Sequence, residues 1–329
     1  MEARLCVVGG GSWGTTFAAL AAQSIDTVLW VRRGELATEI NEHHTNSAYL
    51  GDHQLPSSLW ATSDLGDAAS SADVIAMAVP AHGMRAVASE VARYARPGVP
   101  LMSLAKGLER GTLNRMSEVL AEVAPDHPVA VLSGPNLAHE ILSGQPAASV
   151  VACADAEIAR MLQDQFTRPI FRLYTNSDVI GCEIGGVVKN VVAIAAGIAQ
   201  GFGFGDNTRA TLVTRGLAEM SRLGVALGAN ALTFAGLAGM GDVMATCSSA
   251  QSRNTSVGIR LGRGESITEI MSSMTMVAEG VNSASSVLKL ARQHDVEMPI
   301  AQQVSAVCEG EVSATDALRA LMGRTSKPE

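Results

Sequence analysis

The sequence predicts a two-part protein, in which an α/β domain built on a parallel sheet precedes an all-helical domain. Three observations support this prediction. Short apolar runs alternate with helical patterns through the first half of the chain, which is typical of a parallel sheet covered on both faces. A glycine-rich turn directly follows the first of these runs. After residue 177 only helical periodicity continues, so we expect domains at residues 1–177 and 178–329.

The first apolar run, residues 4–8, ends in the turn Gly9-Gly-Gly-Ser-Trp-Gly14. Gly9 permits a tight turn, Gly11 permits close approach of the backbone to a phosphate, and Gly14 permits a helix to pack on the strand. An apolar-periodic segment follows, and the N–H groups at its start would face an anion. The pattern predicts a Rossmann dinucleotide site. The alternative is a tight turn that holds no ligand.

The second run, residues 27–31, leads into Arg32 and Arg33. Sites built for NAD usually carry an acidic residue here, which accepts hydrogen bonds from the ribose 2′-hydroxyl. Two guanidinium groups instead suit a 2′-phosphate, because arginine pairs with phosphate in a bidentate fork. We therefore predict that the chain binds NADP(H) and also accepts NAD(H). The alternative is a pair of solvated arginines at a strand end.

Later apolar runs predict the remaining strands, at residues 74–79, 100–104, 129–132, 148–153 and 170–174. Ligands of parallel sheets bind beyond the carboxyl ends of the strands. Residues that directly follow a strand are therefore candidates for binding. Lys106 and the Ser133-Gly134 pair lie at such positions.

Composition excludes several classes of protein. With 47% hydrophobic residues, 17% charged residues and a net charge of −8, the chain is globular and unsuited to nucleic acid. Five scattered cysteines without a CxxC pair indicate reduced thiols and a cytoplasmic protein. We expect no membrane span, because the most apolar stretch, residues 223–244, contains Asn230, Asp242 and several glycines. The spacing of the histidines gives no metal site.

Residues 179–201 are predicted to form one helix, with Lys189 on the face opposite an apolar stripe. Alanines and glycines surround Lys189, which favours a functional lysine over the alternative of a solvated one. Asp242 follows an apolar, glycine-dense stretch, and a buried carboxylate needs a cation, for which Lys189 is a candidate. Residues 252–254, Ser-Arg-Asn, could bind a phosphate. The alternative is a polar loop with a solvated arginine.

Taken together, motifs spread over most of the chain resemble those of bacterial NAD(P)-dependent glycerol-3-phosphate dehydrogenases. They are Gly9-Gly-Gly-Ser-Trp-Gly-Thr15, Ala105-Lys-Gly107, Ser133-Gly-Pro135, Gly186-Val-Val-Lys-Asn190, Gly205-Asp-Asn207, Arg215-Gly-Leu-Ala-Glu-Met220, Asp242, Thr246-Cys247 and Ser252-Arg-Asn254. The sequence departs from the family at Asn136 and Leu137, where a serine or threonine and an aromatic residue are common. We therefore assign no substrate contact to Asn136.

The resemblance implies an N-terminal Rossmann domain, a helical C-terminal domain and an active site in the cleft between them. It implies reversible reduction of dihydroxyacetone phosphate to sn-glycerol 3-phosphate for phospholipid synthesis, with Lys189 as the catalytic acid/base. The implied substrate contacts are Lys106, Gly134, Lys189, Asp242, Ser252, Arg253 and Asn254. The implied cofactor contacts are Ser12, Trp13, Arg32, Arg33, Lys106, Ala138, Arg253 and Glu279. They add to Gly9, Gly11 and Gly14, which the turn itself predicts. No metal is expected, and family habit suggests a homodimer.

Two other functions compete with this interpretation. A β-hydroxyacid dehydrogenase has a similar two-domain plan and a catalytic lysine, but its substrate is a carboxylate, and the cluster at residues 252–254 favours a phosphate. A non-catalytic NADP-binding sensor would keep the glycine turn and the two arginines. It would have no need for Lys189, Asp242 and Arg253 together, so their joint presence favours an enzyme.

Overall fold

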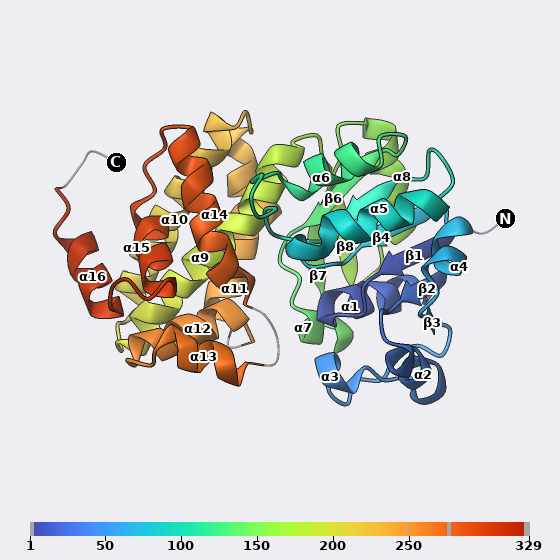
Figure 1. Cartoon of the computed structure of the whole chain (residues 1–329), viewed down its shortest axis with the longest axis horizontal. Coiled ribbons are helices and arrows are strands. Elements are labelled where there is room, and N and C mark those ends of the chain that lie inside the picture. The colour runs from blue at the N-terminus through green and yellow to red at the C-terminus, as the bar shows by residue number, and fades with distance from the viewer. Residues whose placement is uncertain (1–2, 250, 275–277, 326–329) are drawn as a thin grey trace. The chain divides into compact units, whose positions relative to one another are not determined.

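The computed structural model describes residues 3–249, 251–274 and 278–325. The chain divides into two compact units, Met1–Val179 and Ile180–Glu329 (Figure 1). Unit 1 contains the sheet and unit 2 is helical, as the sequence predicts.

Unit 1 is built on one eight-stranded sheet with the strand order β3-β2-β1-β4-β5-β6-β7-β8. All neighbouring strands are parallel except β6 and β7, which pair antiparallel. The strands are β1 (Arg4–Val8), β2 (Asp26–Trp30), β3 (Trp60–Thr62), β4 (Val74–Met77), β5 (Leu101–Ser103), β6 (Val129–Ser133), β7 (Ala147–Ala152) and β8 (Phe171–Asn176). The sequence analysis missed β3, because three residues with an exposed tryptophan at the edge of a sheet leave no apolar run to detect.

Helices cover both faces of this sheet, which explains why its central strands are apolar throughout. One face packs against α1 (Ser12–Ala21), α2 (Gly34–His43), α7 (Ala138–Leu142) and α8 (Ala156–Phe166). The other face packs against α4 (Leu65–Ser70), α5 (Met84–Tyr94) and α6 (Met116–Val123). The short elements α3 (Ser47–Leu50) and η1 (Ala81–Gly83) complete unit 1.

Unit 2 consists of helices and turns over the part of it that the structure describes. Its helical elements are α9 (Val179–Gly201), α10 (Asp206–Ala226), η2 (Ala231–Ala235), η3 (Leu237–Gly241), α11 (Asp242–Ser248), α12 (Arg253–Gly262), α13 (Ile267–Ser273), α14 (Glu279–Gln293), α15 (Pro299–Cys308) and α16 (Ala314–Met322).

Helix α9 is the core helix of unit 2. The expectation of a single apolar stripe is wrong, because Ala193 and Ala196 on the Lys189 side are as buried as the stripe itself. Its length and hydropathy of 1.7 would suffice to cross a membrane, but 83% of the apolar window lies buried inside the protein. That burial is typical of a core helix packed on all sides.

Helices α9 and α12 touch through glycines. A methyl group on Gly197 would collide with the carbonyl oxygen of Thr255 and lie 2.9 Å from the Cα of Gly258. One helical turn further, a methyl group on Gly201 would collide with Ile259 and lie 2.9 Å from the Cα of Gly262. We call these four glycines the glycine seam. Along it the two helices meet backbone to backbone, with no side chain between them.

Candidate functional site

The turn after β1 has the geometry that its glycines predict. Gly9 adopts a φ of +121°, and a Cβ there would lie 2.6 Å from the carbonyl oxygen of Ala78. A Cβ on Gly14 would collide with the carbonyl oxygen of Gly9, so the helix packs directly on the turn. A Cβ on Gly11 would meet no atom within 4 Å, and no side chain caps the start of α1. The turn therefore fits a phosphate at the open N-terminus of α1.

A buried asparagine that the sequence analysis missed supports this turn. The Asn46 side chain is fully buried, and its Nδ2 donates to the carbonyl oxygen of Gly10 (2.9 Å) and to Oγ1 of Thr15 (2.8 Å). The hydroxyl of Ser12 donates to the carbonyl oxygen of Tyr49 (3.2 Å), which ties the same two segments together. Asn46 stands in a polar stretch of the sequence, so composition and periodicity offer no signal for it.

The other predicted cofactor residues of unit 1 surround the same end of the sheet. Arg32 and Arg33 are exposed directly after β2, and neither guanidinium forms an ion pair within the described chain. Trp13 lies between Phe17 and Phe171, with ring centroids 6.1 and 6.0 Å away. Ala138 begins α7 and packs on the core beneath α1.

Lys106 and Gly134 are in contact. Lys106 follows β5, and its Nζ donates to the carbonyl oxygen of Gly134 after β6 at 2.7 Å. Gly134 adopts a φ of +144°, and a Cβ there would lie 2.8 Å from Oγ of Ser149. That hydroxyl donates to Oδ1 of Asn136 (2.7 Å), whose amide nitrogen finds no hydrogen-bond partner among the described residues.

Unit 2 holds the predicted lysine and carboxylate as a buried pair. The Nζ of Lys189 donates to Oδ1 of Asp242 (2.7 Å) and to Oγ1 of Thr246 (2.8 Å). The side chains of Lys189 and Asp242 are 11% and 1% exposed, which excludes the alternative of a solvated lysine. Thr246 was not predicted as a site residue, although it stands one helical turn after Asp242 on α11, where the two side chains share a face.

The cluster at residues 252–254 divides into structural and exposed members. The hydroxyl of Ser252 caps α12 by accepting from the N–H of Thr255 (3.2 Å). Arg253 is exposed. Asn254 is buried, with Nδ2 donating to Oδ1 of Asn190 (2.9 Å) and Oδ1 accepting from the N–H of Gly280 (2.9 Å). Glu279, which precedes that glycine, begins α14.

The amide contacts of Asn254 therefore join three helices. Each helix also carries a predicted site residue next to these contacts. Lys189 directly precedes Asn190, Arg253 precedes Asn254, and Glu279 precedes Gly280.

Cysteine and metal chemistry are not indicated by the described residues. All five cysteines are buried thiols. Burial raises the pKa of the Cys247 thiol, close to the lysine, to about 12, which keeps it protonated and unreactive. No group of three or more His, Cys, Asp or Glu within the described ranges could hold a metal ion.

Comparison with known families now decides between the competing interpretations. Residues 4–159 match the model described as NAD-dependent glycerol-3-phosphate dehydrogenase N-terminus, and residues 178–319 match the corresponding C-terminus. The chain belongs to the NAD-dependent glycerol-3-phosphate dehydrogenase family. It is therefore an oxidoreductase that uses NAD(P), and the β-hydroxyacid dehydrogenase and sensor alternatives are set aside.

Individual relatives match over nearly the whole chain. The chain is 51% identical over 322 residues to glycerol-3-phosphate dehydrogenase (NAD(P)+) 2 of Sphingopyxis alaskensis, covering 98% of this chain and 97% of that one. It is 51% identical over 330 residues to the Thermobifida fusca enzyme, covering 99% and 98%. Among solved structures, glycerol-3-phosphate dehydrogenase of Coxiella burnetii matches with a TM-score of 0.93 at 33% identity, covering 98% and 99%.

Proposed function

We propose that this family member reduces dihydroxyacetone phosphate to sn-glycerol 3-phosphate reversibly, with Lys189 as the general acid/base. The observation that carries this proposal is the buried Lys189–Asp242–Thr246 cluster. An ammonium group has three N–H donors, and Asp242 and Thr246 are its only acceptors within the described chain. The third N–H is thus available to a carbonyl oxygen of the substrate.

Lys189 holds the proton that the reaction requires. When bound, NAD(P)H supplies the hydride that converts the C2 carbonyl of the substrate to an alcohol. Negative charge grows on the carbonyl oxygen in this step, and the Lys189 ammonium stabilises it and then transfers its proton to that oxygen. Asp242 and Thr246 fix the direction of the amine, which reduces the entropy lost on reaching the transition state.

The remaining candidate residues bind the cofactor or the substrate in this proposal. The turn at Gly9, Gly11 and Gly14, with Ser12 and Trp13, would hold the pyrophosphate of the cofactor. The exposed cations Arg32 and Arg33 suit the 2′-phosphate of NADP(H), which supports a preference for NADP(H) with NAD(H) also accepted. Another set would bind the phosphorylated substrate, namely Lys106, Gly134, Asp242, Ser252, Arg253 and Asn254, and Lys106, Ala138, Arg253 and Glu279 would also line the cofactor.

The proposal assigns the Rossmann domain, with most of the cofactor contacts, to residues 1–177 and the catalytic Lys189 to the helical domain at residues 178–329. In the cell, the proposed role of the protein is that of a cytoplasmic enzyme that supplies sn-glycerol 3-phosphate for phospholipid synthesis. Family habit supports a homodimer as the working unit, which light scattering of the purified protein measures directly.

The first experiment follows NADPH oxidation by absorbance with dihydroxyacetone phosphate, in the wild type and in Lys189→Ala. General acid catalysis contributes roughly 10²–10⁴ in rate, so we expect kcat to fall by about that factor. NADPH affinity, measured by fluorescence titration, should stay unchanged. The matched control is Lys289→Ala, which removes an exposed lysine of the same unit and should leave turnover intact. Wild-type protein that binds NADPH without turnover of this substrate would contradict the proposal.

A further inference from the structure

The segment that carries Lys106 is closed on itself. We call residues 104–115, between β5 and α6, the Lys106 loop. Leu108 and Arg115 pair as an isolated antiparallel bridge across its base. The N–H of Glu109 donates to the carbonyl oxygen of Asn114 (2.9 Å), and the N–H of Leu113 donates back to that of Glu109 (3.0 Å). The backbone therefore links the position of Glu109 to that of Lys106, three residues earlier.

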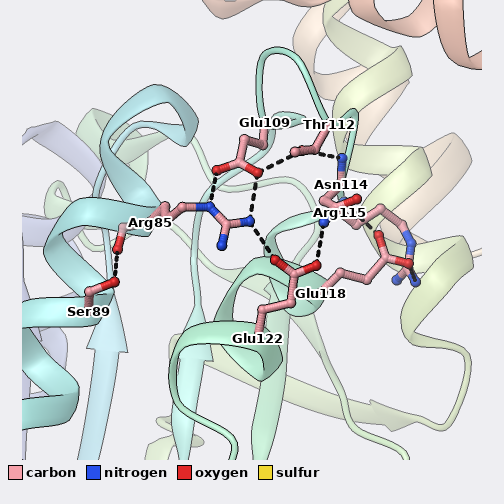
Figure 2. A network of polar contacts seen from close by, with 8 residues as sticks. All are labelled: Arg85, Ser89, Glu109, Thr112, Asn114, Arg115, Glu118 and Glu122. Carbon is pink, nitrogen blue, oxygen red and sulfur yellow. Dashed lines mark hydrogen bonds and ion pairs between the residues drawn. The ribbon is translucent and has the colours of Figure 1, made fainter.

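An arginine of a neighbouring helix holds this loop from outside. Arg85 reaches from α5 to the Glu109 carboxylate with two hydrogen bonds, Nε to Oε1 (2.7 Å) and Nη2 to Oε2 (2.8 Å). Its Nη2 also donates to Oε2 of Glu122 on α6 (2.6 Å). Figure 2 shows the guanidinium between the two carboxylates, so one side chain connects α5, the Lys106 loop and α6.

Two further polar residues of the loop complete the network. The hydroxyl of Thr112 donates to Oε2 of Glu109 (2.6 Å), and Nδ2 of Asn114 donates to Oε1 of Glu122 (2.7 Å) (Figure 2). Both carboxylates thus accept from the loop as well as from Arg85. Networks of this kind hold a fixed geometry better than isolated surface pairs do.

The same helix also contains an ordinary surface pair for comparison. Arg93 and Glu90 make one contact of 3.3 Å, with side chains 70% and 44% exposed. The Glu109 side chain is only 14% exposed, and hydrogen bonds from Arg85 hold the pKa of its carboxyl below the usual value. The Arg85–Glu109 pair is therefore charged at neutral pH and better shielded from water than the Arg93–Glu90 pair.

The loop touches the start of α5 at a second point, next to Lys106 itself. A Cβ on Gly107 would lie 2.6 Å from the Cβ of Ala81, in the turn η1 that precedes α5. On the other side, the Nζ of Lys106 is held by the carbonyl oxygen of Gly134 (2.7 Å). Contacts on two sides, with η1 at Gly107 and with Gly134 at the Lys106 ammonium, therefore set the position of this residue, and a shift of Glu109 would disturb both.

We propose that Arg85, acting through Glu109, is a positioning residue that fixes Lys106 for the phosphorylated substrate. The inference rests on the proposed function, which gives Lys106 its ligand. Arg85 itself touches no reacting group. Its role is to keep the Lys106 ammonium where it meets a phosphate, since displacements of about 1 Å can cost up to ~10² in rate.

The test compares Arg85→Met and Glu109→Gln with the wild type. We expect KM for dihydroxyacetone phosphate to rise about tenfold in each variant, with a smaller change in kcat, because misplacement weakens phosphate binding in ground and transition states alike. The double variant should behave like either single variant, because the two residues act as one unit. Arg93→Met on the same helix is the matched control and should leave KM unchanged.

Combination with Lys106→Met separates positioning from mere stability. If Arg85 acts through Lys106, then Arg85→Met has no further effect on KM once Lys106 is absent, and an effect that persists would overturn the proposal. Hydrogen exchange gives a readout that needs no turnover, since the amides of residues 105–113 should exchange faster in Arg85→Met and not in Arg93→Met. Unchanged exchange also overturns the proposal. Faster exchange without wild-type turnover would instead locate the failure in the proposed function.

Discussion

The arginine pair of unit 1 and the catalytic lysine candidate of unit 2 are held in opposite ways. In unit 1, Arg32 and Arg33 are exposed and form no ion pair with a described acidic residue, and the groups proposed to bind phosphate are backbone N–H groups at the start of α1. In unit 2, Lys189 on α9 is paired with a carboxylate on α11 that is 1% exposed. Arg32 and Arg33 therefore present their charge to solvent, whereas the charge of Lys189 lies inside the core of unit 2.

This difference predicts which residues can change freely. A buried ion pair couples chemistry to folding, because removing one partner leaves an uncompensated charge in a medium that solvates it poorly. Exposed cations contribute little to stability, so they can be exchanged while the fold persists. Substitutions in the two units should therefore separate into those that cost stability and those that change only binding. The following predictions are ordered by their expected effect on the free energy of unfolding.

Asp242→Asn should have the largest effect. Removing one partner of a buried pair typically costs about 3–5 kcal/mol of unfolding free energy, and loss of the carboxylate should also reduce kcat by about 10² or more. Chemical denaturation and steady-state kinetics measure the two effects. Thr246→Val keeps the shape of its side chain and removes only a hydroxyl, so it should cost much less. Equal stability of Asp242→Asn and the wild type would contradict the contrast between the units.

Glu219 extends the comparison to a second buried carboxylate of unit 2. It accepts from the N–H groups of Ile300 (2.7 Å) and Ala301 (3.2 Å) at the start of α15. Burial raises its pKa from 4.5 to about 6, against the opposing effect of these hydrogen bonds and of Arg222 and Arg215.

Because its folded pKa is raised, the stability linked to Glu219 is present below pH 4.5 and is lost as pH rises through about 6. The shift corresponds to about 2 kcal/mol, at ~1.4 kcal/mol per pKa unit. In Glu219→Gln this part of the pH dependence should disappear, which denaturation between pH 4 and pH 7 measures. Parallel stability profiles for the two proteins would show that the carboxylate is not the titrating group.

Asn46→Ala tests a buried polar residue of unit 1, in contrast to the exposed Arg32 and Arg33. The substitution removes two hydrogen bonds beneath the glycine turn and leaves the carbonyl oxygen of Gly10 without this donor, which should cost about 1–3 kcal/mol. NADPH affinity, measured by fluorescence titration, should fall as the turn loosens. Asn41 makes hydrogen bonds of the same kind to Ala61 away from the turn, so Asn41→Ala is the control that should leave NADPH affinity intact.

Arg32→Asp should have the smallest effect on stability and a large effect on specificity. An exposed substitution usually changes stability by less than about 0.5 kcal/mol. A carboxylate there would repel a 2′-phosphate and accept from a 2′-hydroxyl, so the preference should shift from NADPH toward NADH. The ratio of kcat/KM for the two cofactors measures this shift, with Arg172→Asp as an exposed control on β8. An unaltered ratio would place the 2′-phosphate elsewhere.

Sequence patterns predicted two kinds of feature: residues that act together within a short segment, and charged residues that require a partner of opposite charge when buried. The glycine turn was predictable because each glycine has its own steric reason, and the Lys189–Asp242 pair because a buried carboxylate requires a cation. Asn46 and the Arg85 network were not predictable. The partners of Asn46 and of Arg85 lie 24 or more residues away in the sequence, and polar side chains in loops or on helix surfaces carry no period that indicates tertiary contacts.

The fold shows the same limit. Strands with continuous apolar runs were predicted close to their true bounds, since burial on both faces leaves an unambiguous pattern. The antiparallel pairing of β6 with β7 was not predictable, because apolar runs do not record direction. The extent to which α9 is buried was also underestimated, since alanines and glycines beside Lys189 are equally compatible with an exposed surface and with packing against another helix.

The glycine seam between α9 and α12 has a consequence for how unit 2 can evolve. Lys189 stands on one of these helices, and Ser252 caps the other. Where two main chains are in direct contact, the distance between the helices is set by the backbone atoms and does not vary with the choice of side chains. Substitutions elsewhere in the unit can therefore alter its core while the spacing and register of α9 and α12 stay the same.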